Sequence, residues 1–388
     1  SILYFLVVLC LAFSAREKIG KSLLQASVTK QTVLLIVVFV FSFYLFQRSF
    51  SYDFYSSEFL ISSNLYQDMG AHIPFIRSFS QGENYPAEVP FFAGKDLLYH
   101  FMFDLYAGIL EFLGLNLVHA YNLVSALALT FLLVIIYEVS VSLFGNSIVG
   151  ILSSLLFLFN NDFSFLDFLK KNGLNQTFLS RVWHNSEYSS LSFLNLPYSN
   201  FLNINVLLNQ RHLVFGLFIF FTIIYILINP KTTKKELTVV VILIGLLPFW
   251  HIPIFIAVTI IFLLFLLFKF TKIKSKIIFF LLLLISCPQL ILIKLNSVNI
   301  TLFRPGFLVW DHLSIQSFGL FWFFMFGIAP ALALIALRYA NKKQRLFFLL
   351  FISLFIIPNI FQFGPDMFDN HKFFNIFTNI RILFLIPK

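Results

Sequence analysis

Charged residues are scarce in this chain. Asp, Glu, Lys and Arg make up 11% of its 388 residues, while hydrophobic residues make up 59%. A soluble domain carries about 25% charged and about 45–50% apolar residues. Mean hydropathy is +0.90, so we expect lipid rather than water to surround most of the chain. Because the apolar runs are continuous rather than alternating, the sequence predicts an all-α polytopic membrane protein.

Cysteines are rare, and the common catalytic motifs are missing. Cys10 and Cys287 both lie in apolar runs, which is typical of core packing and not of a disulfide framework or a metal site. The sequence has no Walker loop, dinucleotide fingerprint, HExxH pair or GxSxG elbow. These absences argue against ATP-driven transport, nicotinamide chemistry and zinc proteolysis.

Apolar segments recur along the whole chain. They cover roughly residues 2–13, 32–47, 118–137, 147–159, 213–229, 237–249, 250–268, 277–293, 317–337, 346–361 and 378–388. Several are shorter than the ~20 residues that a helix needs to cross a bilayer. Pro248 and Pro253 predict a tight turn between two short passes. Both ends lie inside apolar runs, so we expect a single transmembrane domain over 1–388 that is cut at both ends.

Positive charge gives these segments an orientation. Of the 27 Lys and Arg residues, 15 fall in four clusters, at 16–30, 231–235, 269–276 and 338–345. The segment count places all four clusters on one side, which the positive-inside rule makes cytoplasmic. The loop around Glu138 falls on that side without a basic cluster. The net charge of +10 therefore indicates membrane orientation, and we expect no nucleic-acid partner.

The opposite side receives two long loops, 48–116 and 160–212. Residues 48–96 carry six acidic and three basic side chains, so positive charge does not gather there. Long ordered loops usually carry binding and chemistry. We therefore expect the functional site on this outer face.

A polar patch, YQDMGAHIPFIRSFSQG, opens the first outer loop and contains Asp68, His72 and Arg77. A helix beginning near Gly70 would make Asp68 its N-cap and would tolerate Pro74 in its first turn. His72 would then sit one turn from Asp68. Two interpretations stay open: Asp68 is a reactive carboxylate, or it only caps the helix.

Further candidate residues lie in the segment 97–115, which we interpret as an amphipathic helix at the outer interface. His100 and Asp104 are spaced i, i+4 and would share one face of that helix. The alternative is a hydrogen-bonded pair that only anchors the helix.

Two more polar groups flank apolar runs on the same side. Arg211 and His212 precede the run at 213–229, where a helix N-terminus and an arginine would bind an anion; a snorkelling arginine is the alternative. In the last outer loop, Lys372 could hold a phosphate. Asp369 and His371 match no standard metal spacing, so a solvated loop is favoured there.

The stretch from Asp68 to about Ala126 resembles the first outer loop of GT-C-fold glycosyltransferases, such as protein O-mannosyltransferases and the aminoarabinose transferase acting on lipid A. The runs DMGAHIPFIRSFSQG, AGKDLLYHFMFDLYAGILEFLGL and VHAYNLVSALAL follow in the order of that family. Lys95, Tyr99 and His100 stand where the family has a lysine and an aromatic pair. Met69 replaces the second acidic residue often found in the family, and KDL replaces KPP.

The resemblance implies a GT-C-like helical bundle in the plasma (inner) membrane. It also implies a polyprenyl-phosphate sugar donor and transfer to a glycan, lipid or protein acceptor on the outer or periplasmic face, usually with inversion. Asp68 would be the general base or a ligand of a divalent cation that helps the leaving group. The residues expected to bind substrate are His72, Arg77, Lys95, Tyr99, His100, Asp104, Arg211, His212 and Lys372, with Arg211 and Lys372 on the phosphate. The alternatives are a transporter or lipid flippase, and a non-catalytic membrane scaffold.

Overall fold

The computed structural model describes most of the chain. It covers residues 30–62, 65–160, 164–184, 192–193, 196–197, 203–229, 232–269, 274–294, 302–327, 329–364 and 366–383. The apolar run predicted at 2–13 and most of the first basic cluster lie outside these residues, as does the end of the run at 378–388.

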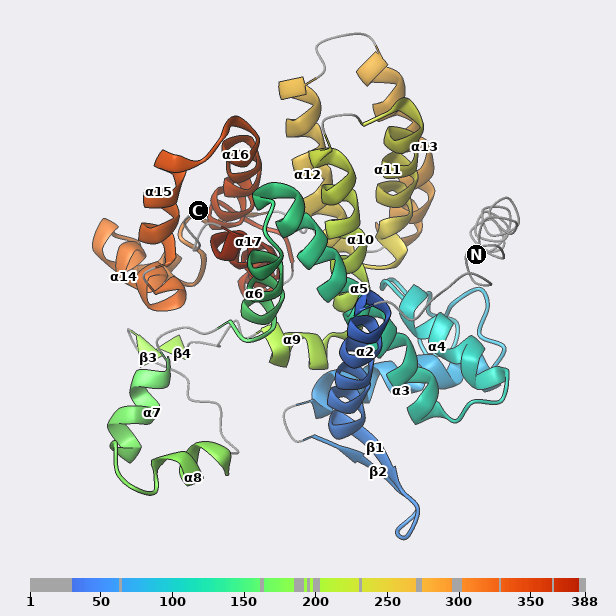
Figure 1. The fold of residues 1–388 in the computed structure, drawn as a ribbon. Helices are drawn as coiled ribbons and strands as arrows, with labels where there is room; N and C mark the ends of the chain where they lie inside the picture. Colours follow the sequence, from blue (N-terminus) through green and yellow to red (C-terminus); the bar gives the residue numbers. More distant parts are fainter. Residues whose placement is uncertain are drawn as a thin grey trace.

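Helices make up most of the described chain (Figure 1), which confirms the all-α prediction. The longer helices are α2 (Lys30–Ser49), α3 (Tyr66–Gln81), α4 (Met102–Phe112), α5 (Leu117–Phe144), α6 (Ser147–Leu158), α10 (Arg211–Ile228), α11 (Lys234–Leu246), α12 (Ile252–Lys269), α13 (Lys274–Lys294), α14 (Ile315–Phe326), α15 (Ala329–Tyr339), α16 (Lys342–Ile356) and α17 (His371–Leu383). The shorter ones are α7 (Ser164–Asn172), α8 (Phe178–Trp183), α9 (Asn203–Asn209) and the 3₁₀ turns η1 (Leu247–Phe249), η2 (Phe307–His312), η3 (Ile357–Asn359) and η4 (Met367–Asn370). The short antiparallel strand pairs are β1 (Phe50–Asp53) with β2 (Glu58–Ile61), β3 (Ser192–Phe193) with β4 (Leu196–Pro197), and β5 (Leu302–Phe303) with β6 (Phe361–Gln362).

Three of the described helices are long and apolar enough to cross a membrane: α2 over Thr32–Ser49, α5 and α10. A fourth crossing is possible by length and composition if α14 and α15, bent by 77°, count as one span. Other predicted runs form shorter apolar helices, such as α6 and α12. The predicted break at 247–253 is confirmed, because α11 ends at Leu246 and α12 begins at Ile252.

Helix α5 is central, packing against α2, α6 and α10. It contains no proline or glycine, begins at the Asn116 cap, and ends at Gly145, whose φ of 68° lies in the left-handed region that favours glycine. At its C-terminal end, Lys343 donates to the Ser142 carbonyl (3.1 Å) and Gln344 to the Leu143 carbonyl (2.9 Å). The basic segment 338–345 and the end of α5 therefore lie at the same end of the molecule, as the segment count predicts.

The predicted first outer loop folds into the hairpin β1–β2 and the helix pair α3 and α4. In Figure 1 the hairpin projects away from the helices. Helix α4 packs on α3 through Gly108, where an added Cβ would lie 2.9 Å from both the Ile76 carbonyl oxygen and the Phe79 Cβ. A glycine is required there, because any side chain would separate the two helices. In the predicted second outer loop, 160–212, the structure describes α7, α8, β3, β4 and α9.

Two predicted details of this region are wrong. Helix α3 begins at Tyr66 after the N-cap Leu65, so Asp68 lies in the first turn instead of capping it, and Pro74 lies inside the helix. Helix α4 begins only at Met102, so His100 precedes it and does not share a helical face with Asp104. Asp104 instead faces α3, where it bonds to His72.

Candidate functional site: a buried histidine cluster

His72 of α3 and Asp104 of α4 form a buried pair. His72 Nδ1 lies 2.9 Å from Asp104 Oδ2 and 3.1 Å from Oδ1, and the two residues are only 3% and 1% exposed. Burial opposes a charged imidazole, but the charge of Asp104 and its hydrogen bond outweigh this effect and raise the pKa of His72. Burial also raises the pKa of Asp104, against the opposing effect of His72. The two groups therefore titrate as a pair.

Asp68 lies one helical turn before His72 on α3 and remains partly exposed. Its charge also contributes to raising the pKa of His72, after the larger effect of Asp104. Asp68 is thus a carboxylate at the edge of the buried pair, within electrostatic range of it.

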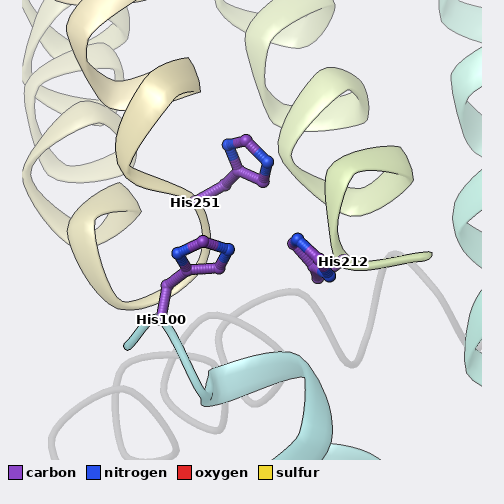
Figure 2. A group of neighbouring side chains, drawn as sticks. All are labelled: His100, His212 and His251. Carbon is purple, nitrogen blue, oxygen red and sulfur yellow. The ribbon is translucent and has the colours of Figure 1, made fainter. Parts of the chain in front are cut away.

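Three further histidines converge beside this pair (Figure 2). His100 comes from the segment before α4, His212 from the start of α10, and His251 from the break between η1 and α12. Their ring centroids lie 4.7 Å (His100–His212), 4.8 Å (His100–His251) and 5.2 Å (His212–His251) apart. One nitrogen of each ring lies within 4.8 Å of one nitrogen of each of the others. Segments far apart in sequence therefore present three imidazoles to one point.

Each of these three rings has a buried nitrogen without a hydrogen-bond partner: His100 Nε2, His212 Nδ1 and His251 Nε2. The residues are 5%, 2% and 0% exposed. A buried polar atom left unsatisfied costs about 1–3 kcal/mol, and native proteins carry few such atoms. Burial lowers the pKa of His100 well below its usual value, and the charges of His251 and Lys372 add to this effect. His100 is therefore a neutral imidazole with a nitrogen lone pair to share.

Tyr99 links the two groups of histidines. Its hydroxyl lies 3.3 Å from His212 Nε2, and its ring stacks on His100 at a centroid distance of 3.8 Å. The His72 and His212 rings lie 4.9 Å apart. Burial raises the pKa of Tyr99 above its usual range, so the hydroxyl stays protonated and positions the His212 ring.

Arg211 does not have the geometry expected of an anion-binding residue. Its side chain is 0% exposed; Nη1 donates to Asn122 Oδ1 (2.6 Å) and Nη2 to Ser49 Oγ (3.0 Å). The guanidinium carbon lies 4.3–5.8 Å from the ring centroids of Phe46, Phe50 and Tyr121. Its partners lie on α2, β1 and α5, so the guanidinium that was predicted to contact phosphate is enclosed where α10 meets these elements.

The other predicted residues lie in different surroundings. Arg77 forms an ion pair with Glu111 (3.1 Å) and is 38% exposed. Lys95 is exposed. The Lys372 ammonium lies 3.1 Å from Asp369 Oδ1, and its charge acts on His100. Hydrogen bonds and ring contacts thus join His72, Asp104, Tyr99, His100 and His212. The charges of Asp68 and Lys372 act on this cluster from nearby.

His251 is the member of the site that sequence reasoning missed. A signal was present: LPFWHIP was predicted as a turn between two passes, and the segment count would have put that turn on the outer side. The structure brings this turn against His100 and His212.

Comparisons with protein-family models, with curated proteins and with solved structures give no match to this chain. The resemblance to GT-C-fold glycosyltransferases therefore rests on the sequence motifs alone.

Proposed function

We propose that this chain is a membrane glycosyltransferase of GT-C type. It would move a sugar from a polyprenyl-phosphate donor to an acceptor hydroxyl at the outer face of the plasma (inner) membrane. The observation that carries the proposal is the position of Asp68, a partly exposed carboxylate beside the buried His72–Asp104 pair. The neighbouring His212 is the second residue of the candidate span α10, and a lipid-linked donor presents its phosphate at such a span end.

In the proposed reaction, the acceptor hydroxyl gives its proton to the Asp68 carboxylate as its oxygen attacks the anomeric carbon of the donor. The bond between that carbon and the phosphate oxygen breaks, and the electron pair leaves with the phosphate. Lys372 is the cation assigned to the leaving phosphate. Its side chain is 13% exposed and already held by Asp369; Arg211 is left out because its guanidinium is enclosed.

Asp68→Asn tests this assignment, since the amide keeps the shape of the side chain but cannot accept the proton. A general base contributes about 10²–10⁴-fold to a rate, so sugar transfer should fall by about that factor while the amount of inserted protein stays the same. Asp96→Asn is the matched control, because Asp96 is an exposed aspartate in the same outer loop. Unaltered transfer by Asp68→Asn would contradict the catalytic role.

A transporter or flippase would give a different outcome. Reconstituted protein would then move a substrate across the bilayer of proteoliposomes without forming any glycosylated product. That result would replace the transferase proposal.

A further inference from the structure

We propose that His100, His212 and His251 form a binding site for a divalent transition-metal ion, with zinc as the first choice. Zinc sites that do chemistry commonly use three protein ligands and leave a fourth position for water or substrate. This proposal is independent of sugar transfer, because it concerns binding of the metal alone.

The spacing of the rings fits such a site after a small movement. Zinc–nitrogen bonds of about 2.0–2.1 Å place tetrahedral ligand nitrogens about 3.3 Å apart. One nitrogen of each ring already lies within 4.8 Å of the others, so the widest pair needs to close by about 1.5 Å at most. The proposal requires the three side chains to rotate by this amount when the ion binds.

Each of the three rings has a nitrogen that no hydrogen bond occupies. His212 has a free Nδ1, while its Nε2 contacts the Tyr99 hydroxyl; a second partner that fixes the ring is typical of a metal-ligating histidine. His100 and His251 each have a free Nε2. His251 Nδ1 accepts a long hydrogen bond from the Ile254 amide (3.3 Å). Metal binding at Nε2 would place the ring proton on Nδ1, so this contact would open.

The type of donor selects the type of cation. Three imidazole nitrogens suit zinc and other transition metals, whereas calcium and magnesium prefer oxygen ligands. The Asp104 carboxylate is hydrogen-bonded to His72, whose ring is 4.9 Å from that of His212, so its negative charge is largely balanced by His72. The positive charge of Lys372 disfavours a bound cation, but the ion pair of Lys372 with Asp369 offsets part of that charge.

The test uses the full chain in detergent or nanodiscs, stripped with a chelator and then equilibrated with zinc alone. Metal analysis should find about one zinc ion per chain in the wild type. His251→Ala should weaken binding by more than about 100-fold, since loss of an outer partner alone costs about 10–100-fold. Tyr99→Phe, which removes that outer partner of His212, should weaken binding by about 10-fold.

His312→Ala is the matched control, because His312 is exposed and is not one of the three; it should bind zinc as the wild type does. Cobalt(II) added to the stripped wild type should give the strong visible absorption of a tetrahedral site. This measurement decides the proposal even if His251→Ala does not fold. Equal zinc binding by wild type and a folded His251→Ala variant, or a weak octahedral cobalt spectrum, would overturn it.

Discussion

Replacing Arg211 by lysine distinguishes a structural arginine from a phosphate-binding one. Arg211→Lys keeps the buried positive charge but loses the planar fork that bonds Asn122 and Ser49 together. Losing one hydrogen bond to a charged group costs about 1.5–3 kcal/mol, and weaker stacking on the rings adds about 0.5–1 kcal/mol. We therefore expect the free energy of unfolding to fall by about 2–4 kcal/mol.

The assay is reversible unfolding of the detergent-solubilised chain, followed by circular dichroism. Arg345→Lys is the control: Arg345 is exposed, and a surface substitution of this kind should change stability by less than about 0.5 kcal/mol. A double-mutant cycle with Asn122→Ala should give a coupling energy of about 1.5–3 kcal/mol for the 2.6 Å bond.

If Arg211→Lys is as stable as the wild type but loses sugar transfer, Arg211 acts on the substrate and does not serve mainly to stabilise the fold. If stability falls and the remaining folded protein transfers sugar normally, the structural assignment holds.

Two further predictions concern packing and metal linkage. Gly108→Ala should destabilise the chain by about 1–3 kcal/mol, as overpacking does, because the new Cβ would meet α3. Gly319→Ala is the control: its new Cβ meets open space, so it should be neutral or stabilising in the same unfolding assay. Equal effects of the two substitutions would contradict the packing argument. Zinc at about 100 times its dissociation constant should raise the free energy of unfolding by about 2.7 kcal/mol, measured by thermal unfolding with and without a chelator. His251→Ala should show no such gain. A gain of the same size in that variant would mean that zinc binds elsewhere.

The sequence anticipated several individual positions in the site, because polar residues are conspicuous in so apolar a chain. Asp68, His72, Asp104 and Lys372 were identified from local patterns, and Tyr99 from the family resemblance. The sequence did not predict which of these side chains would form hydrogen bonds with one another. The spacing of His100 and Asp104 predicted one shared helical face, whereas Asp104 bonds to His72, which lies 32 positions away in the chain.

By itself, the sequence determined that the chain is mostly helical. Its long apolar runs favour helices, which satisfy their own backbone hydrogen bonds, and three of the described helices are long and apolar enough to cross a membrane. Only the tertiary structure decided which polar residues meet. It enclosed Arg211 among the rings of α2, β1 and α5 and brought His251 to His100 and His212. Such contacts depend on how helices far apart in sequence pack against one another, which local periodicity does not encode.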